Sequence, residues 1–546
     1  MASQFDELRT LLEEEVEDEP AEIDNFAEES DIDSEDEVEQ CILNSETEQS
    51  ENEIEEDDKE EGNSFMGKDK KTEWLNKPLK KSRRRKSHNI CIHLPGVIGN
   101  AKNAKTPYEC WNNFFTDNVI ELIVTYTNIY IDSVKDRFVR QRDIKSTDAI
   151  EVKAFIGLLY LAGVYRANRM SLEDLWGKEG DGIEKFSLVM SLKRFNTLIC
   201  CLRFDDRRTR NQRKENDRLA PVRIIFEKFV DNCQKSFSPG ENLTIDEMLP
   251  GFRGRCQFRQ YIPSKPNKYG VKLYSLVDAS MFYTVKMEIY AGQQPQGPFC
   301  FSNKPSDVVM RMAEPLFGFG RNITADNWFT SFDLIDKLKT MKLSYVGTVR
   351  KNKKQRPIAF INVKGRKAKT SLFGFNNDKV LVSYIPRERK NVILVSSLHD
   401  DDAIDPQSGE QMKPEIITFY NLTKCGVDVA DQMCASYNVS RNTRRWPMVI
   451  FYTILNVAGI NSQVIYIGNN LEKKRRRLFL KELSHELVLE HLQRRSMNTV
   501  GIPNSLHIRM QRFRPRIEQE KSQSPPTSKR RRCVTCTLET GVRRLS

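Results

Sequence analysis

Apolar residues recur at helical spacing over the first third of the folded part of the chain. From Thr106, the segment TPYECWNNFFTDNVIELIVTYTNIYID repeats large apolar residues every three or four positions, which predicts a helix with one buried face. Thr106 suits the N-cap, and Pro107 suits the first helical position. Further helices are predicted at 151–165, 192–202 and 222–231. Residues 106–240 are therefore predicted to be a helical region.

The periodicity changes near Asn242. Four short apolar runs follow, LTIDEML, GFRGRCQFRQYIP, KYGVKLYSLVDAS and FYTVKMEIYAG, and they predict successive strands. A helix at about 306–317, the strand RNITADNWF, the helix FTSFDLIDKLKTM and the strand SYVGTVR come next. This alternation of strands and helices predicts an α/β domain whose first part spans residues 241–350.

The remainder of the chain divides into four segments. Residues 351–414 carry short β runs between basic loops, which predicts a β-rich insertion, and a helix near Val427 returns the chain to the α/β domain at 415–437. Residues 438–516 are helical again. Their longest apolar stretch, Met448–Ile467, is broken by polar residues and predicts a buried helix, not a membrane span. Residues 517–546 predict a mobile basic tail.

Charge is distributed very unevenly along the 546 residues, whose formal net charge is +10. Of the 76 acidic residues, 28 lie in residues 1–61 beside only two basic ones, which leaves 48 acidic and 84 basic residues in the remainder. Such a basic body favours a polyanionic partner, and nucleic acid is the usual one. A soluble protein with excess surface lysine is the plainer alternative.

The first 105 residues are predicted to be an arm outside the folded body. Residues 1–62 are too acidic and too poor in apolar side chains to form a core, so disorder is expected, with nuclear proteins as partners. A basic run follows, which suits nuclear import or a DNA-backbone contact: Lys77, Lys80, Lys81, Arg83, Arg84, Arg85 and Lys86. Twelve scattered cysteines favour a reducing compartment. A soluble nuclear protein is expected, with no membrane partner.

Four aspartates are candidates for the chemistry. Asp246 lies within an apolar strand, where a carboxylate is costly unless it binds a cation or pairs with a base. Asp326 ends a strand, and Asp428 and Asp431 lie three residues apart at a helix start, so they project from one face. Such oxygen ligands suit Mg²⁺ or Mn²⁺, and two ions about 4 Å apart can activate a nucleophile and stabilise a leaving oxygen.

Each aspartate also has a plainer explanation. Asp246 could form a salt bridge, Asp326 could be a turn residue, and Asp431 could cap its helix. Spacing alone does not decide between these roles and a shared metal site.

Three ordered blocks of sequence closely resemble the piggyBac transposases. They are LTIDEMLPGFRGRCQFRQYIPSKPNKYGVKLY, NITADNWFTS and GVDVADQM with the following SRNTRRWPM, and a weaker resemblance extends over most of residues 106–510. The resemblance implies an RNase H-like catalytic core with the β-rich insertion, flanked by an α-helical dimerisation and DNA-binding domain. It implies that Asp246, Asp326 and Asp428 form a catalytic, metal-binding triad, with Asp431 as a supporting carboxylate.

The resemblance also implies a reaction and partners. Transposon ends would be nicked by hydrolysis, the 3′-hydroxyl would form a hairpin, and the released end would join DNA at TTAA, within a homodimer that pairs two ends. Basic residues beside the carboxylates would hold phosphates of the double-stranded DNA. The candidate contacts are Arg253, Arg255, Arg259, Lys265, Lys268, Lys272, Arg441, Arg444, Arg445, Lys473, Lys474, Arg475, Arg476 and Arg477. Trp446 could stack on a displaced base or be a core residue.

The C-terminal tail departs from the family pattern. The family usually ends in a cysteine-rich, zinc-binding domain, whereas here Cys533 and Cys536 form a single C-x₂-C pair. A structural zinc site needs four ligands, so zinc binding is not expected from this pair alone. Two functions stay open: an active transposase, and a host-recruited nuclear DNA-binding protein without transposition activity.

Overall fold

The computed structural model describes residues 63–78, 90–138, 144–177, 182–263, 265–470, 473–498 and 501–515, and the backbone of Cys41–Ile42. The contacts divide the chain into two compact units, Met1–Leu492 and Gln493–Ser546. The second unit includes α16 (Asn504–Met510) and the short 3₁₀ helix η9 (Gln511–Phe513), and Arg514 Nε donates to the Ser496 carbonyl at 3.4 Å. All the elements that follow begin in the first unit.

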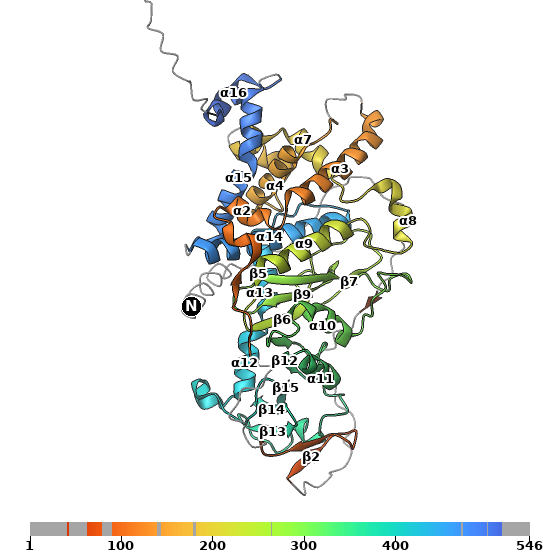
Figure 1. The fold of residues 1–546 in the computed structure, drawn as a ribbon, viewed down its shortest axis with the longest axis vertical. Coiled ribbons are helices and arrows are strands. Elements are labelled where there is room, and N and C mark those ends of the chain that lie inside the picture. Colours follow the sequence, from red (N-terminus) through yellow and green to blue (C-terminus); the bar gives the residue numbers. More distant parts are fainter. Residues whose placement is uncertain are drawn as a thin grey trace, which may run out of the picture. The chain divides into compact units, whose positions relative to one another are not determined.

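Five adjacent strands form one half of a ten-stranded sheet in the first unit. They are β6 (Asn242–Met248), β9 (Leu273–Asp278), β10 (Thr284–Ile289), β11 (Asn322–Ala325) and β12 (Ser344–Thr348). Their order is β10-β9-β6-β11-β12, and Figure 1 labels β9, β6 and β12 one below the other. β9 is antiparallel to both of its neighbours, whereas β6, β11 and β12 are parallel. Every residue of β9 and β11 is buried, as expected for strands covered on both faces.

Helices pack against these strands and confirm the predicted alternation. α9 (Arg223–Ser236) packs against β10, and α13 (Gly426–Ser436) packs against β6 and β9. α10 (Pro305–Ala313) packs against β9 and β10, and α11 (Phe332–Thr340) packs against β12. A further helix, α12 (Glu415–Thr423), precedes α13 and contacts β6, β12 and β15. The protein is thus a mixed α/β structure with a large mixed sheet.

The sheet continues beyond β12 through the segment predicted as an insertion. β13 (Ser371–Asn376), β14 (Lys379–Arg387) and β15 (Lys390–Ser396) form an antiparallel meander, and β15 pairs with β12. A 3₁₀ helix, η7 (Ile358–Phe360), and another, η8 (Pro406–Gln411), flank the meander. The β-rich segment therefore belongs to the same hydrogen-bonded sheet as β10, β9, β6, β11 and β12.

Part of the predicted N-terminal arm is folded, which corrects the boundary at residue 105. β2 (Ser64–Met66) and β3 (Glu73–Leu75) form a hairpin, and β3 pairs with β13 at the edge of the sheet (Figure 1). Trp74 is fully buried, and its indole N–H donates to the Gln355 carbonyl at 2.9 Å. The sequence placed this segment in the arm, but one buried aromatic residue anchors it to the folded body. Residues 90–105 are also placed, with β4 (Gly96–Val97) paired to β5 (Phe237–Ser238).

The segment 251–263 is mainly a loop, although its apolar residues predicted a strand. Only β7 (Arg259–Tyr261) is extended, paired with β8 (Tyr269–Val271) and with the backbone of β1 (Cys41–Ile42). Phe252 is buried, and an ideal Cβ at Gly254 would lie 2.3 Å from its ring. The backbone therefore folds directly over that ring, a path that only glycine permits without displacement.

The helical region lies above the sheet in Figure 1 and contains the predicted helices. Its long helices are α3 (Asp117–Val134), α4 (Ala149–Val164), α7 (Leu192–Cys201), α14 (Trp446–Asn470) and α15 (Arg476–Met497). Shorter ones are α2 (Pro107–Asn112), α5 (Leu172–Leu175), α6 (Glu184–Val189) and α8 (Arg210–Lys214), with 3₁₀ turns η2 (Gly99–Asn103), η3 (Lys135–Arg137), η5 (Arg207–Thr209) and η6 (Glu314–Leu316). Thr106 caps α2 with a capping box, and Pro107 occupies the first turn, as predicted.

One buried hydrogen-bond relay joins three of these helices. The Trp111 indole N–H of α2 donates to the Tyr160 hydroxyl of α4 at 2.9 Å, and that hydroxyl donates to the Leu455 carbonyl of α14 at 2.6 Å. Within the described residues, Trp446–Asn469 is the one helix long and apolar enough to cross a membrane, and 94% of its apolar window is buried inside the protein. Burial of this helix agrees with the prediction of a core helix.

Candidate active site

Asp246 and Asp326 lie on neighbouring parallel strands. Asp246 is in β6, and Asp326 directly follows β11. The register pairs Ala325 with Ile245, so the two aspartates are at the same level of the sheet. Carboxyl ends of parallel strands meet at one edge, which is why residues far apart in sequence come together here.

Asp326 is held by the turn that follows β11. The Trp328 backbone N–H donates to Asp326 Oδ1 at 2.9 Å, and the Thr330 hydroxyl donates to the Asp326 carbonyl at 2.8 Å. Trp328 stacks on Tyr274 of β9, with ring centroids 5.9 Å apart. The turn is therefore fastened to the strand beyond β6, and its position relative to Asp246 is set by the sheet.

Helix α13 brings Asp428 and Asp431 to the same strands. Its first residue, Gly426, lies so close to β6 that an ideal Cβ would be 2.6 Å from Thr244 Oγ1. Thr423, at the end of α12, accepts a 2.5 Å hydrogen bond at its carbonyl from the Thr244 hydroxyl, and its own hydroxyl lies 2.8 Å from that of Thr324. The junction of α12 and α13 is thus tied to both β6 and β11.

Lys265 supplies a positive charge among these acids. Its Nζ lies 3.2 Å from Asp428 Oδ1, and its side chain is only 18% exposed. Burial lowers the pKa of Lys265, but the charges of Asp246, Asp428 and Asp431 outweigh burial, so the pKa is raised overall. Lys265 was predicted to hold DNA phosphates, whereas in this structure its ammonium group neutralises the aspartates.

Glu247 is a fifth acidic residue of the site that sequence reasoning missed. Its carboxylate accepts a 2.7 Å hydrogen bond from Lys272 Nζ, and Lys272 is 2% exposed. The lysine lies 4.6 Å from the Trp328 ring centroid and 4.9 Å from that of Tyr274. Lys272 was predicted as a DNA contact, but its burial excludes it from an open surface. The sequence did contain a signal for Glu247, because IDEM places two adjacent acidic residues in an apolar strand.

These residues form what we call the carboxylate centre: Asp246, Glu247, Asp326, Asp428 and Asp431. Burial and the charge of Glu247 raise the pKa of Asp246 well above its usual value. Burial, with the charge of Glu247, raises the pKa of Asp326 to about 6, although backbone N–H groups of Trp328 and Phe329 oppose the shift. Burial also raises the pKa of Asp431, against the lowering effect of Lys265. Burial therefore disfavours the ionised form of three of these carboxyl groups, those of Asp246, Asp326 and Asp431.

A divalent cation fits this donor set chemically. Carboxylate oxygens are hard ligands suited to Mg²⁺ or Mn²⁺, and the raised pKa values reflect a shortage of positive charge that a cation would relieve. Over the described residues, no three His, Cys, Asp or Glu side chains are already spaced to hold a metal ion. Lys265 lies among the acids instead, and Asp428 is 63% exposed. Asp428 and Lys265 would therefore have to adjust for an ion to bind.

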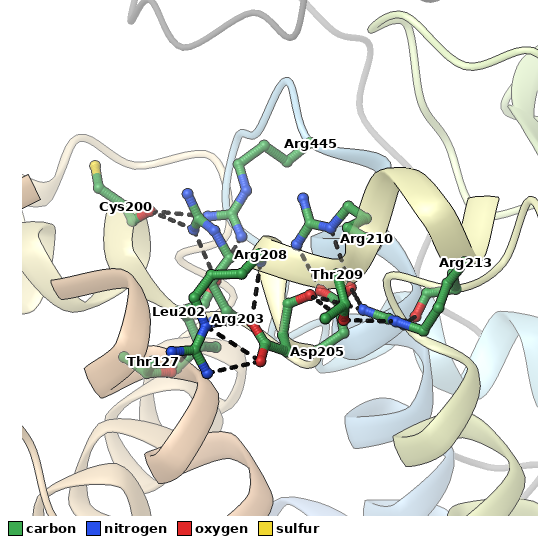
Figure 2. Close-up of polar contacts among 12 residues, drawn as sticks. Thr127, Cys200, Leu202, Arg203, Asp205, Arg208, Thr209, Arg210, Arg213 and Arg445 are labelled. Atoms are coloured by element: carbon green, nitrogen blue, oxygen red, sulfur yellow. Dashed lines mark hydrogen bonds and ion pairs between the residues drawn. The ribbon is translucent and has the colours of Figure 1, made fainter. Parts of the chain in front are cut away.

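Two predicted DNA contacts, Arg441 and Arg445, bond to backbone carbonyls within the protein, and for the buried Arg441 this corrects the assignment. Arg441 is 9% exposed, and its guanidinium donates to the Ala167 and Met170 carbonyls. Arg445 donates to the Ile199, Cys200 and Leu202 carbonyls at the end of α7 (Figure 2). Helix C-termini leave such carbonyls without intrahelical partners, and a cation satisfies them.

Other predicted contacts are also engaged within the protein. Arg259 donates to the Arg253 and Gly254 carbonyls. Trp446 is 8% exposed and packs edge-on to Phe258, with ring centroids 5.0 Å apart. Trp446 was predicted either to stack on a displaced base or to be a core residue, and in this structure it is a core residue. Lys474 pairs with Glu482 at 2.6 Å, and Arg476 is 1% exposed beside the Tyr437 ring. These contacts depend on distant segments, which local sequence does not reveal.

The remaining predicted contacts stay on the surface. They are Arg253, Arg255, Lys268, Arg444, Lys473, Arg475 and Arg477, all exposed. Arg253, Arg255 and Lys268 lie in the chain between β6 and β8, close in sequence to the carboxylate centre. Cys533, Cys536 and most of the basic run at 77–86 lie outside the described residues, as does nearly all of the acidic segment 1–62.

Comparisons with known proteins show what the chain is similar to. The family model described as Transposase IS4 matches residues 106–463. The human PiggyBac transposable element-derived protein 3 is 26% identical over 357 residues, which cover 63% of this chain and 58% of that protein. The human PiggyBac transposable element-derived protein 5 is 22% identical over 247 residues, covering 44% of this chain and 46% of that protein. The chain therefore matches about half of the length of these curated relatives.

A solved structure matches a larger share. A cryo-EM structure of a piggyBac transposase synaptic complex with hairpin DNA aligns with a TM-score of 0.73 and 36% identity, over 80% of this chain and 90% of that one. The family match covers well over half of the chain, and the structural match covers most of both chains. The chain belongs to the piggyBac-type branch of the Transposase IS4 family.

Proposed function

We propose that this protein cleaves and joins DNA strands, with Asp246, Asp326 and Asp428 as the catalytic triad and Asp431 as a supporting carboxylate. The observation that carries the proposal is the convergence of these residues. Two come from adjoining parallel strands at one level of the sheet, and two come from a helix fastened to those strands. Burial disfavours the ionised carboxylates of Asp246 and Asp326, and a bound cation would stabilise them, which supports a role in binding cations and, through them, a phosphodiester.

The order of the strands β10, β9, β6, β11 and β12 supports an RNase H-like interpretation of the core. Numbered in chain order, its five strands lie as 3-2-1-4-5, and the second is antiparallel to its neighbours. The first acid lies on strand one and the second directly after strand four. This arrangement matches what the sequence resemblance implied for the first two triad residues.

Asp246, Asp326 and Asp428 would hold Mg²⁺ or Mn²⁺, with Asp431 beside them. When bound, two such ions activate a water or a 3′-hydroxyl and stabilise the oxygen that leaves phosphorus. The protein's own contribution is orientation. The Trp328 N–H fixes the Asp326 carboxylate, and the paired Glu247 and Lys272 hold β6 beside that turn.

The proposed reaction follows the family. Water would attack a phosphodiester at each element end and release a 3′-hydroxyl, which would attack the opposite strand to form a hairpin. After the hairpin opens, the 3′-hydroxyl would join a TTAA target. The solved neighbour is a synaptic complex with hairpin DNA, which supports DNA as the substrate. A homodimer is proposed as the working unit. A nuclear location is proposed with it.

The test is joining of a pre-cut oligonucleotide, ending in a 3′-hydroxyl and bearing the gene's own flanking sequence, into a plasmid that contains TTAA. The parent protein should join strands in Mg²⁺ or Mn²⁺, and Asp326→Asn should reduce joining by more than about a hundredfold. Asp402→Asn makes the same charge change at an exposed position and should join like the parent.

The alternative is a recruited DNA-binding protein that breaks no bonds. Two of the similar human proteins are named as transposable element-derived, and these names favour the alternative. If the parent binds the oligonucleotide but joins none in either metal, the transposase proposal fails and the alternative replaces it. Equal joining by the parent and Asp326→Asn would refute the assigned triad.

A further inference from the structure

A second charged cluster lies in the helical region, between the end of α7 and α8. We call it the arginine surface, and Figure 2 shows most of its residues. It consists of Arg203, Arg207, Arg208, Arg210, Arg213 and Arg445. The acids that pair with it are Asp205 and Asp206. The cluster thus gathers six guanidinium groups, of which Arg208, Arg210 and Arg213 pair with these two carboxylates.

One buried carboxylate fixes the shape of this segment. The Asp205 side chain is 1% exposed and pairs with Arg210 at 2.5 Å and with Arg213 at 2.6 Å (Figure 2). Arg213 also donates to the Asp206 and Ala220 carbonyls. A single negative charge thus holds two positive ones in place, and the segment keeps a net positive charge while being firmly anchored.

The guanidinium groups of Arg203 and Arg445 donate to the same two backbone carbonyls. Arg203 Nη1 donates to the Cys200 carbonyl at 2.8 Å and to the Leu202 carbonyl at 2.9 Å, and Arg445 donates to both as well. Over the described residues, neither arginine forms an ion pair with a carboxylate. Burial and the neighbouring charge of Arg445 lower the pKa of Arg203 to about 9, so these cations repel each other. An anion bound beside them would relieve that repulsion.

The rest of the cluster faces outward. Arg207 is exposed and lies 5.4 Å from the Tyr130 ring centroid, and Arg203 lies on the same ring at 3.5 Å. The Arg208 side chain is 70% exposed while it pairs with Asp206. Positive charge therefore runs from a buried layer to the surface, where a large anion can reach it.

The arginine surface is joined to the chain around the carboxylate centre. The segment 444–446 contacts both regions. An ideal Cβ at Gly254 would lie 2.9 Å from the Arg444 carbonyl, and Trp446 packs on Phe258, so this segment touches the loop that follows β6. Arg445, the next residue in the chain, donates to the Cys200 carbonyl at the end of α7. Exposed arginines at 253, 255 and 444 lie along this connection.

We propose that the arginine surface binds the sugar-phosphate backbone of duplex DNA that flanks the strand held at the carboxylate centre. This inference rests on the proposed function and adds a surface to it. Guanidinium groups suit phosphate because their donors form paired hydrogen bonds to its oxygens. Contacts of this kind position a duplex without reading its sequence. The surface combines residues from two segments more than 200 positions apart, Arg203–Arg213 and Arg445.

The test uses the double variant Arg207→Gln, Arg208→Gln, which removes two exposed charges and leaves the buried layer intact. A matched control is Arg387→Gln, Lys390→Gln, with two exposed charges at the tip of the β14–β15 hairpin. Fluorescence anisotropy would measure binding to a duplex of about 30 base pairs from 50 to 300 mM NaCl, for the flanking sequence and for a scrambled one.

We expect the Arg207, Arg208 double variant to bind both duplexes about 5- to 20-fold more weakly, and the slope of log affinity against log salt to fall by about 1 to 2. The hairpin control should match the parent. A parent-like affinity and slope in the Arg207, Arg208 variant would overturn the inference. So would a loss confined to duplex RNA of the same sequence.

The outcome can be separated from that of the proposed function. If the parent joins DNA but the double variant binds as the parent does, the carboxylate function stands and the arginine surface is rejected. If the parent joins no DNA while the double variant loses affinity and salt dependence, the surface stands and the joining activity is rejected.

Discussion

In the carboxylate centre, five acidic side chains meet Lys265 and Lys272, and in the arginine surface, six arginines meet Asp205 and Asp206. Each region has one buried ion of the opposite sign, Lys272 or Asp205, that makes hydrogen bonds and holds the backbone. In the first region, burial raises the pKa values of Asp246, Asp326 and Asp431, and in the second, burial and the charge of Arg445 lower the pKa of Arg203.

The two regions differ in what supports them. The acids stand at strand ends and at the start of a helix, so the sheet register sets their spacing. The arginines stand at the end of α7, in the short helices η5 and α8, and just before α14, where side-chain bonds to carbonyls and carboxylates set their positions. A small ion needs exact spacing of few ligands, whereas a phosphate backbone needs only a broad field of positive charge. The rigid support and the looser one match those two needs.

The largest expected effect comes from removing the buried anchor of the arginine surface. Asp205→Asn leaves Arg210 and Arg213 without their carboxylate, so the free energy of unfolding should fall by about 3 to 5 kcal/mol. Urea unfolding measures this change. Asp206→Asn, next in sequence and paired with the exposed Arg208, should cost less than about 1 kcal/mol. Equal losses in the two variants would mean that burial does not distinguish them.

An intermediate effect is expected from pH in the carboxylate centre. The folded pKa of Asp326 is about 6, above its usual 3.8, so the folded protein binds the proton more tightly than the unfolded one. That contribution to stability is complete below pH 4 and is lost as pH rises through 6. In chelator at pH 7.5, Asp326→Asn should therefore be more stable than the parent by about 2 to 3 kcal/mol, and by roughly half as much at pH 5. Urea unfolding at the two pH values tests this; a difference that does not change with pH would contradict it.

The smallest expected effect concerns Lys265. Replacing it with methionine removes a positive charge that lies 3.2 Å from Asp428, so a divalent cation would meet less repulsion. Mn²⁺ affinity, measured by calorimetry without DNA, should rise about tenfold. Lys268→Met removes an exposed charge three residues away and should leave the affinity within about twofold of the parent. Weaker Mn²⁺ binding in Lys265→Met would instead make the lysine a supporting residue of the metal site.

Local sequence was enough to predict most of the elements and where the four aspartates lie on them. Asp246 in a strand, Asp326 at a strand end and Asp428 at a helix start each follow from short apolar patterns, and the strand register then brings the first two together. Their catalytic and metal-binding roles remain predictions. The arginines were harder, because Arg444 and Arg445 are neighbours with opposite environments. Arg444 is exposed, whereas Arg445 bonds to carbonyls about 245 residues earlier in the chain.

The same reason explains why Glu247 and the N-terminal hairpin were missed. Glu247 belongs to the site because it pairs with Lys272. The buried position of Lys272 depends in turn on packing between β9 and the turn after β11. The hairpin is defined by a partner strand 300 residues later. Neither contact leaves a periodic trace in its own segment.

That long separation has a consequence for biosynthesis. The strand at Glu73–Leu75 leaves the ribosome well before its partner at Phe375 has been made. At translation rates of 5 to 20 residues per second, the delay is roughly 15 to 60 seconds. Throughout that interval Trp74 has no burial site, so a chaperone that binds exposed aromatic residues would meet the nascent chain there first. The outermost strands of the sheet, encoded early, are among the last to be placed.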